Sequence, residues 1–202
     1  MTDQNAIRDD IAFMRALAEE GRNGPLLGGS IMMAGGGLFG TTSLVIWIGL
    51  LNGLAIDSWI QLAWPVSGLL FFVALFVLVR RSPLPKGGAA RAVGIAWSAA
   101  GWTMFVLICS LIIMAARLDD GRIMGAISPA ILALYGCSWF IAAAASRRRW
   151  LYAVTAGSFL MALVTAWFAL QTVDYLIYAI SLFALVAAPG FVLTRQARKA
   201  AA

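Results

Sequence analysis

The sequence predicts an all-α, polytopic membrane protein with six transmembrane helices, arranged as three antiparallel hairpins in one bundle. Of its 202 residues, 62% are apolar and only 12% are charged, about half the charged share of a typical soluble domain. The charges fall in short clusters that separate uncharged stretches of about 20 residues, the length of helix that crosses a bilayer core. The basic residues concentrate in alternate connecting segments, as orientation signals do in membrane proteins.

Residues 1–25 are predicted to form a cytoplasmic or interfacial amphipathic helix and a linker. Arg8, Arg15 and Arg22 repeat every seven residues and form a stripe beside the apolar face of this helix. These arginines are candidates for lipid-headgroup contact, with the helix lying on the inner leaflet. The alternative is a docking helix for a cytoplasmic partner or a second copy of the chain. The apolar face consists of Ile7, Ile11, Met14, Leu17 and Ala18.

Residues 26–194 are predicted to form one transmembrane domain, followed by a short basic cytoplasmic tail at 195–202. None of its six spans contains Asp, Glu, Lys or Arg. All the connections are short, so consecutive helices are expected to be antiparallel neighbours. The predicted spans are residues 27–51, 59–79, 93–116, 123–145, 151–170 and 175–193.

The distribution of charge predicts the orientation of the bundle. Thirteen of the 15 basic residues precede the first span, follow the last, or lie between spans two and three or four and five. The opposite side carries only Arg117 and Arg122, and it also carries Asp57, Asp119, Asp120 and Asp174. The positive-inside rule therefore predicts that both termini are cytoplasmic. A composition rich in arginine, alanine and glycine is typical of a GC-rich bacterial genome, which favours the bacterial inner membrane.

Gly36 and Gly40 in the first span form a GxxxG motif. Missing side chains let a second helix backbone approach closely, so this face is predicted to be a helix-packing surface. The partner helix is either within the same bundle or in a second copy of the chain. In the second case the first span would hold a homo-oligomer together.

Gln61 and Pro65 in the second span are the candidate contact for a solute. Proline has no N–H, so the carbonyl of Gln61 is expected to lose its helical partner and the helix to bend. A freed carbonyl beside the Gln61 amide would suit a polar ligand. Alternatively, the kink only shapes the helix, and a neighbouring hydroxyl or water satisfies the carbonyl.

Arg147, Arg148 and Arg149 follow the fourth span and are candidates for binding an anionic lipid headgroup or a docking partner. The alternative is that they orient the protein and extend their charged ends to the membrane surface.

The composition excludes several classes of chemistry. The chain has no histidine, the usual general base near neutral pH and the commonest metal ligand. Its two cysteines, Cys109 and Cys137, are far apart and lie in apolar stretches, so no thiol redox or zinc motif is present. The basic residues bracket the spans, which argues against nucleic-acid binding. No catalytic, cofactor-binding or metal-binding residue is predicted.

We therefore expect a membrane protein that is not an enzyme. The favoured function is an accessory, regulatory or scaffold component that acts through contacts of its transmembrane helices and its N-terminal helix. Its expected surroundings are the lipid bilayer and a membrane or cytoplasmic protein partner. The alternative is a small oligomeric transporter or channel for a neutral or lipid-like solute.

Overall fold

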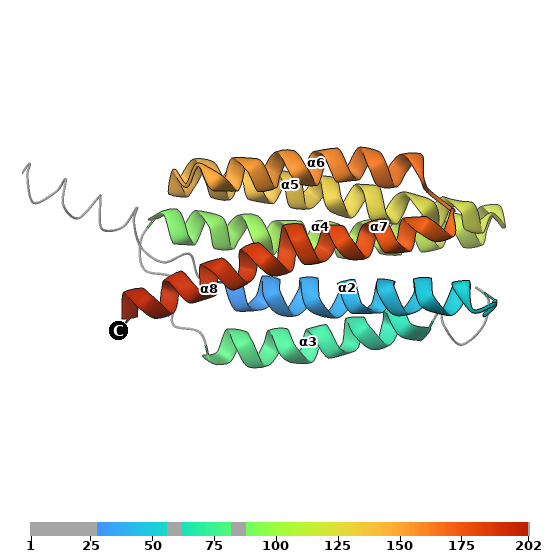
Figure 1. Ribbon diagram of the computed structural model, residues 1–202, viewed down its shortest axis with the longest axis horizontal. Coiled ribbons are helices and arrows are strands. Elements are labelled where there is room, and N and C mark those ends of the chain that lie inside the picture. Colours follow the sequence, from blue (N-terminus) through green and yellow to red (C-terminus); the bar gives the residue numbers. More distant parts are fainter. Residues whose placement is uncertain (1–27, 56–61, 82–87, 202) are drawn as a thin grey trace, which may run out of the picture.

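The computed structural model describes residues 28–55, 62–81 and 88–201, and every regular element in these ranges is helical. The helices lie side by side along one long axis (Figure 1). The predicted N-terminal helix, with Arg8, Arg15 and Arg22, lies outside the described residues, as does Gln61.

Six helical stretches are long and apolar enough to cross a membrane, which makes the chain a multi-pass membrane protein. The first three are the α-helices α2, α3 and α4. The fourth begins as a 3₁₀ helix, η2, and continues as α5. The sixth contains a π-helical segment, η3, between α7 and α8. Their bounds are α2 Gly29–Leu51, α3 Ala63–Arg81, α4 Gly88–Leu118, η2 Gly121–Ala126, α5 Ile127–Ser146, α6 Trp150–Trp167, α7 Thr172–Leu182, η3 Phe183–Ala187 and α8 Ala188–Ala201.

Several helix ends differ from the predicted span ends. Helix α4 extends beyond both ends of residues 93–116. Helix α8 continues through the predicted tail to Ala201, because Ala, Arg, Gln and Lys favour helix. Helix α6 ends at Trp167, and the turn that follows includes Leu170 in the left-handed region at φ 68°. The apolar stretches locate the spans, whereas local backbone preferences decide where each helix stops.

The helices form two groups. In the first group, α2 packs on α3, α7, η3 and α8. In the second, α5 packs on α4 and α6, and η2 lies against α4 and α5. The backbones of the two groups approach each other mainly where α6 meets α7 and η3. We call the boundary between the groups the seam.

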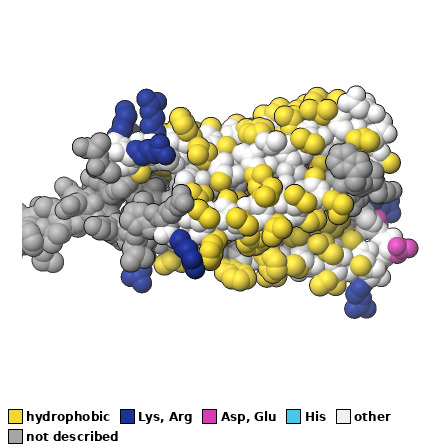
Figure 2. All heavy atoms as spheres, turned by 90° about the horizontal axis from the view of Figure 1, so that it is seen from below, with side chains coloured by type: hydrophobic (Ala, Val, Ile, Leu, Met, Phe, Trp, Pro, Cys, Tyr) yellow, Lys and Arg dark blue, Asp and Glu magenta, His cyan; other side chains and the backbone are white. Residues whose placement is uncertain are grey.

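The hydrophobic core spans both groups and includes Leu132, Trp139, Leu151, Leu182 and Val186, all almost fully buried. Two helices contribute little to it: 6% of the apolar stretch of α3 and 11% of that of α4 are buried, against 28–44% in the other four. Hydrophobic side chains cover the middle of the molecular surface, and basic side chains lie near its ends (Figure 2). Helices α3 and α4 therefore flank the core and present apolar faces outward.

Candidate functional site at the seam

The sixth helical stretch, formed by α7, η3 and α8, is called the last helix. Helix α2 crosses it so closely that only glycine fits at the contact. A Cβ atom added to Gly29 would lie 2.6 Å from the carbonyl oxygen of Gly190, and one added to Gly190 would lie 2.6 Å from the backbone nitrogen of Met33. A Cβ added to Gly36 would lie 2.5 Å from the backbone nitrogen of Ala187. Such separations are well inside van der Waals contact, so these three glycines set the distance between the helices.

The structure places both glycines of the predicted GxxxG motif against η3 of the same chain. A Cβ added to Gly40 would lie 3.1 Å from the ring of Phe183, the first residue of η3. Gly36 and Gly40 are both buried within the bundle. This intramolecular contact occupies the face that the alternative, a homodimer, would require. Gly29 and Gly190, which complete the crossing, were not singled out from the sequence.

The π-helical segment widens the last helix opposite Gly36. The N–H of Ala188 donates to the carbonyl of Phe183, five residues earlier. Pro189 follows and has no N–H to offer the carbonyl of Leu185 four residues before it. The indole Nε1 of Trp139 on α5 donates to that Leu185 carbonyl at 2.9 Å. A side chain of the second group thus satisfies a backbone group that the last helix leaves free.

Aromatic rings pack against one another within each group and belong to the hydrophobic core or lie against it. In the second group, Trp97 meets Trp139 edge to face with centroids 5.0 Å apart, and it lies 5.8 Å from the ring of Tyr135. In the first group, Trp64 packs on Tyr178 with centroids 6.3 Å apart. The Nε1 atom of Trp97 is buried and has no hydrogen-bond partner. These ring contacts therefore join helices within each group, whereas the hydrogen bond from Trp139 to the Leu185 carbonyl joins the two groups.

A carboxylate lies at one end of the seam. Ser128 Oγ on α5 donates to Asp174 Oδ2 on α7 at 2.9 Å. The other carboxyl oxygen, Oδ1, is buried and has no hydrogen-bond partner. Beside it, Ser43 Oγ on α2 donates to the carbonyl of Tyr175 at 2.8 Å. Asp174 thus links the two groups through one oxygen and leaves the other unsatisfied.

Another polar contact crosses the seam at the opposite end. The guanidinium of Arg148 donates to Gln196 Oε1 on α8. Partial burial lowers the pKa of Arg148. Arg147 has a φ of 53° and ends α5, and both Arg147 and Arg149 are exposed. Of the three arginines predicted to bind a headgroup, Arg148 therefore contacts the protein itself, and Arg147 and Arg149 are exposed.

The predicted solute contact at Gln61 and Pro65 is described only at Pro65, and Pro65 does not produce a kink in the middle of a helix. Pro65 is exposed and is the third residue of α3, which begins at Ala63. In the first turn of a helix the backbone nitrogens have no intrahelical acceptor, so a proline breaks no hydrogen bond there. A solute contact at Gln61 and Pro65 stays a prediction. The nearest polar link between α2 and α3 is a hydrogen bond between Thr42 Oγ1 and Ser67 Oγ.

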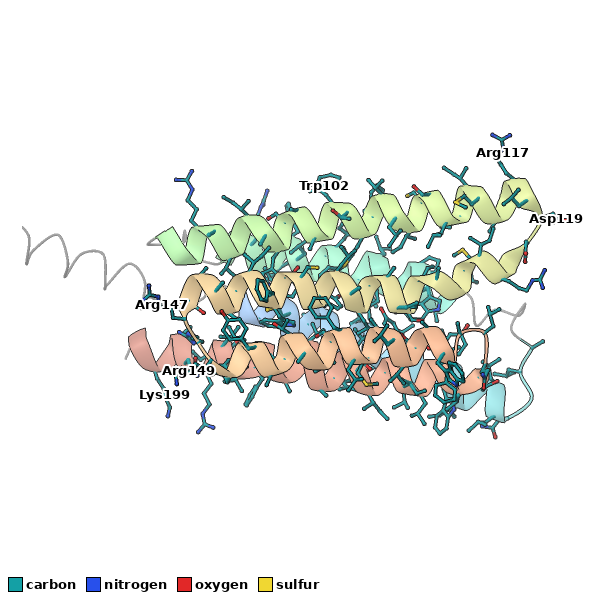
Figure 3. The ribbon with its side chains drawn as sticks, turned by 90° about the horizontal axis from the view of Figure 1, so that it is seen from above. Trp102, Arg117, Asp119, Arg147, Arg149 and Lys199 are labelled. Carbon is teal, nitrogen blue, oxygen red and sulfur yellow. The ribbon has the colours of Figure 1, made fainter. Side chains whose placement is uncertain are left out.

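The outward face of α4 carries a shallow hollow lined by aromatic, aliphatic and hydroxyl side chains. Trp102 projects outward from the middle of this helix and is 72% exposed (Figure 3). The hydroxyls of Thr103 and Ser110 bond to carbonyls of their own helix, at 2.9 and 2.8 Å. The lining residues are Trp102, Thr103, Val106, Leu107 and Ser110.

The chemistry available at the seam is hydrogen bonding and charge. Within residues 28–55, 62–81 and 88–201, no group of three His, Cys, Asp or Glu side chains is placed to hold a metal ion. Cys109 is half-buried, Cys137 is exposed, and both are free thiols.

Asp174 is the polar residue that sequence reasoning placed differently. The sequence predicts Asp174 outside the membrane, on the side opposite the basic clusters, because it directly precedes the predicted span 175–193. The structure puts it in the first turn of α7, half-buried against α5. Acidic residues are favoured in the first turn of a helix, and this preference is the signal that would have moved the helix start before Asp174.

Comparison of the chain with protein-family models, with curated protein sequences and with solved structures gives no significant match.

Proposed function

We propose that the protein is a membrane component without a catalytic site that acts through helix–helix contacts, as an accessory, regulatory or scaffold subunit. The outward face of α4 supports this proposal most directly. Tryptophan prefers the membrane interface, yet Trp102 is exposed in the middle of a 31-residue helix. Neighbouring hydroxyls of Thr103 and Ser110 can hydrogen-bond to another helix. The proposed partner is a transmembrane helix of a second membrane protein.

Photocrosslinking in the cells that naturally express the protein tests this proposal. A photoreactive amino acid replaces Trp102 in one variant and Leu163 on α6 in the control. Leu163 is 71% exposed, which matches the 72% of Trp102. We expect a discrete protein adduct from position 102 and only lipid adducts from position 163. Lipid adducts alone from both positions would contradict the proposal.

We further propose that the six spans form three antiparallel hairpins in a bacterial inner membrane, with both termini in the cytoplasm. Arg147, Arg149 and Lys199 lie at one end of the molecule, and Arg117 and Asp119 lie at the other (Figure 3). The end with more basic residues is the one that the positive-inside rule assigns to the cytoplasm.

Cysteine labelling tests this orientation. In a background without the two native cysteines, an impermeant thiol reagent applied to intact spheroplasts should label Asp119→Cys and leave Arg147→Cys unlabelled. Labelling of Arg147→Cys alone would reverse the proposed orientation, and labelling of both would contradict a single orientation.

Transport of a neutral or lipid-like solute is a second candidate, which the construction of the seam favours. The two helix groups have hydrogen bonds at opposite ends of the seam, Ser128 with Asp174 and Arg148 with Gln196. An irregular helical segment, η3, lies between these ends. Interrupted helices and movement of one helix group against another are recurrent features of transporters.

Glycerol permeation tests this candidate with a neutral probe. Shrinkage and reswelling of liposomes in a glycerol gradient is followed by light scattering, with and without the purified full-length protein. Faster reswelling that Trp102→Leu leaves intact would favour transport. A rate equal to that of protein-free liposomes would count against passage of small neutral solutes.

A further inference from the structure

The unsatisfied oxygen of Asp174 requires a physical explanation. An ionised carboxylate that is removed from water needs hydrogen bonds or an opposite charge to both oxygens, and leaving one without a partner is costly. Ser128 satisfies Oδ2 at 2.9 Å, but Oδ1 is buried with no hydrogen-bond partner. A bound proton removes the negative charge and therefore most of this cost.

Within residues 28–55, 62–81 and 88–201, the groups around Asp174 supply no compensating charge. Helix α2 contributes Ser43, whose hydroxyl is already donated to the carbonyl of Tyr175. Helix α5 contributes Ser128 and, further along, Tyr135. The titratable groups on α7 itself are Tyr175 and Tyr178, which are also acids.

The charged groups of the neighbouring 3₁₀ segment are paired with each other. At the start of η2, Arg122 Nε lies 3.0 Å from Asp120 Oδ1, and this ion pair is exposed. Among the described residues, no basic side chain forms an ion pair with Asp174. In the part of the chain that the structure describes, the carboxyl therefore has a hydroxyl donor, nearby phenols and no cation paired with it.

We propose that Asp174 is a proton-binding site that holds the two helix groups together at this end of the seam when it is protonated. Protonation leaves a neutral carboxyl group that still accepts the hydrogen bond from Ser128. Loss of the proton leaves a negative charge in a poorly solvated position, which favours water entry and separation of α5 from α7. This site does not depend on the proposed partner of α4. Its ligand is the proton.

The competing explanation is that Asp174 stays ionised and stabilises the N-terminus of α7. A negative charge in the first turn of a helix interacts favourably with the helix dipole. The two explanations predict opposite signs for the effect of pH on stability. If the folded state holds the proton more tightly than the unfolded chain, stability is present at low pH and is lost as the pH rises. If the ionised form is favoured, stability rises with pH.

Thermal unfolding of the full-length protein in detergent distinguishes these outcomes. The apparent Tm is measured from about pH 5 to about pH 8, above the range in which ordinary carboxyls titrate. We expect the Tm of the wild type to fall by several degrees over this range. Asp174→Asn, which mimics the neutral acid, should keep a high Tm throughout. Asp120→Asn, at the exposed ion pair, should follow the wild type.

A wild-type Tm that rises or stays constant with pH would overturn the proposal. So would an unchanged pH dependence in Asp174→Asn. These results leave the proposed α4 partner untouched, because the photocrosslinking experiment uses a different face of the molecule.

Infrared spectroscopy of the wild type provides a measurement that does not depend on the folding of Asp174→Asn. A carbonyl stretch of a protonated carboxylic acid is expected at about pH 6, where exposed carboxyls are ionised. Its disappearance should require a higher pH in Ser128→Ala, because the hydroxyl that stabilises the charged form is missing. Absence of the band at about pH 6 in the folded wild type, where exposed carboxyls are ionised, or an unchanged midpoint in Ser128→Ala, would overturn the proposal.

Discussion

Three glycines bring α2 against the last helix, although glycine is a poor helix former. Each glycine inside a helix costs roughly 1 kcal/mol relative to alanine in water. At Gly29, Gly36 and Gly190 an added Cβ would lie within 2.6 Å of a backbone atom of the opposite helix. At Gly37, the next residue of α2, an added Cβ meets nothing within 4 Å. The same residue type is therefore required at one position and dispensable one residue later.

Bulk at Gly36 is expected to separate these helices. Gly36→Ile should destabilise the protein by about 3 kcal/mol or more, because overpacking against a backbone cannot be relieved by a side-chain rotation. The free energy of unfolding is measured by titration with a denaturing detergent. Gly37→Ala is the matched control and should be neutral or slightly stabilising. Equal stability of the two variants would contradict the close crossing.

The last helix is the element that depends most on its neighbours. Its π-helical segment lies opposite Gly36. Its Leu185 carbonyl accepts a hydrogen bond from Trp139 on α5. Trp139→Phe should cost about 1–3 kcal/mol, because it leaves this partly buried carbonyl without the Trp139 donor. Trp97→Phe is the control and should cost less, since the Trp97 indole nitrogen has no hydrogen-bond partner to lose.

Pro189→Ala should then partly rescue Trp139→Phe. Alanine restores a backbone N–H four residues after Leu185, and this N–H can donate to the Leu185 carbonyl within the same helix. A double-mutant cycle of unfolding free energies measures the coupling between the two substitutions. Purely additive effects would show that Trp139 and Pro189 do not share the Leu185 carbonyl.

Much of the architecture at the element scale could be predicted from the sequence. Uncharged stretches of span length locate all six helices, because exposing a charge to lipid is costly. Their ends were less accurate, since helix α4 continues into polar residues and Leu170 takes a left-handed turn after α6.

The candidate site was only partly accessible to sequence reasoning. Gly36 and Gly40 were singled out as packing residues, but their neighbour, η3, depends on a tertiary contact. The π-helical segment has no periodic signature of its own. Asp174 required knowing that α7 begins before the apolar stretch and that Ser128 lies across the seam.

At the scale of the whole molecule, apolar side chains surround the middle, and charged side chains mark the ends (Figure 2). Two helix groups meet along a seam that hydrogen bonds cross, and α3 and α4 flank them with faces that the core does not use. This arrangement supports a function in which the core is a stable scaffold and the flanking helices face other membrane components.

Native mass spectrometry of the tagged full-length protein, extracted in mild detergent at its natural expression level, tests the central claim most directly. Removal of residues 2–22 in a parallel sample tests the predicted N-terminal docking helix. We predict a complex with a second protein in fixed stoichiometry, and loss of that protein from the shortened chain if the N-terminal helix holds it. A monomer or homo-oligomer that carries only lipid or a small solute would contradict the accessory function and favour transport.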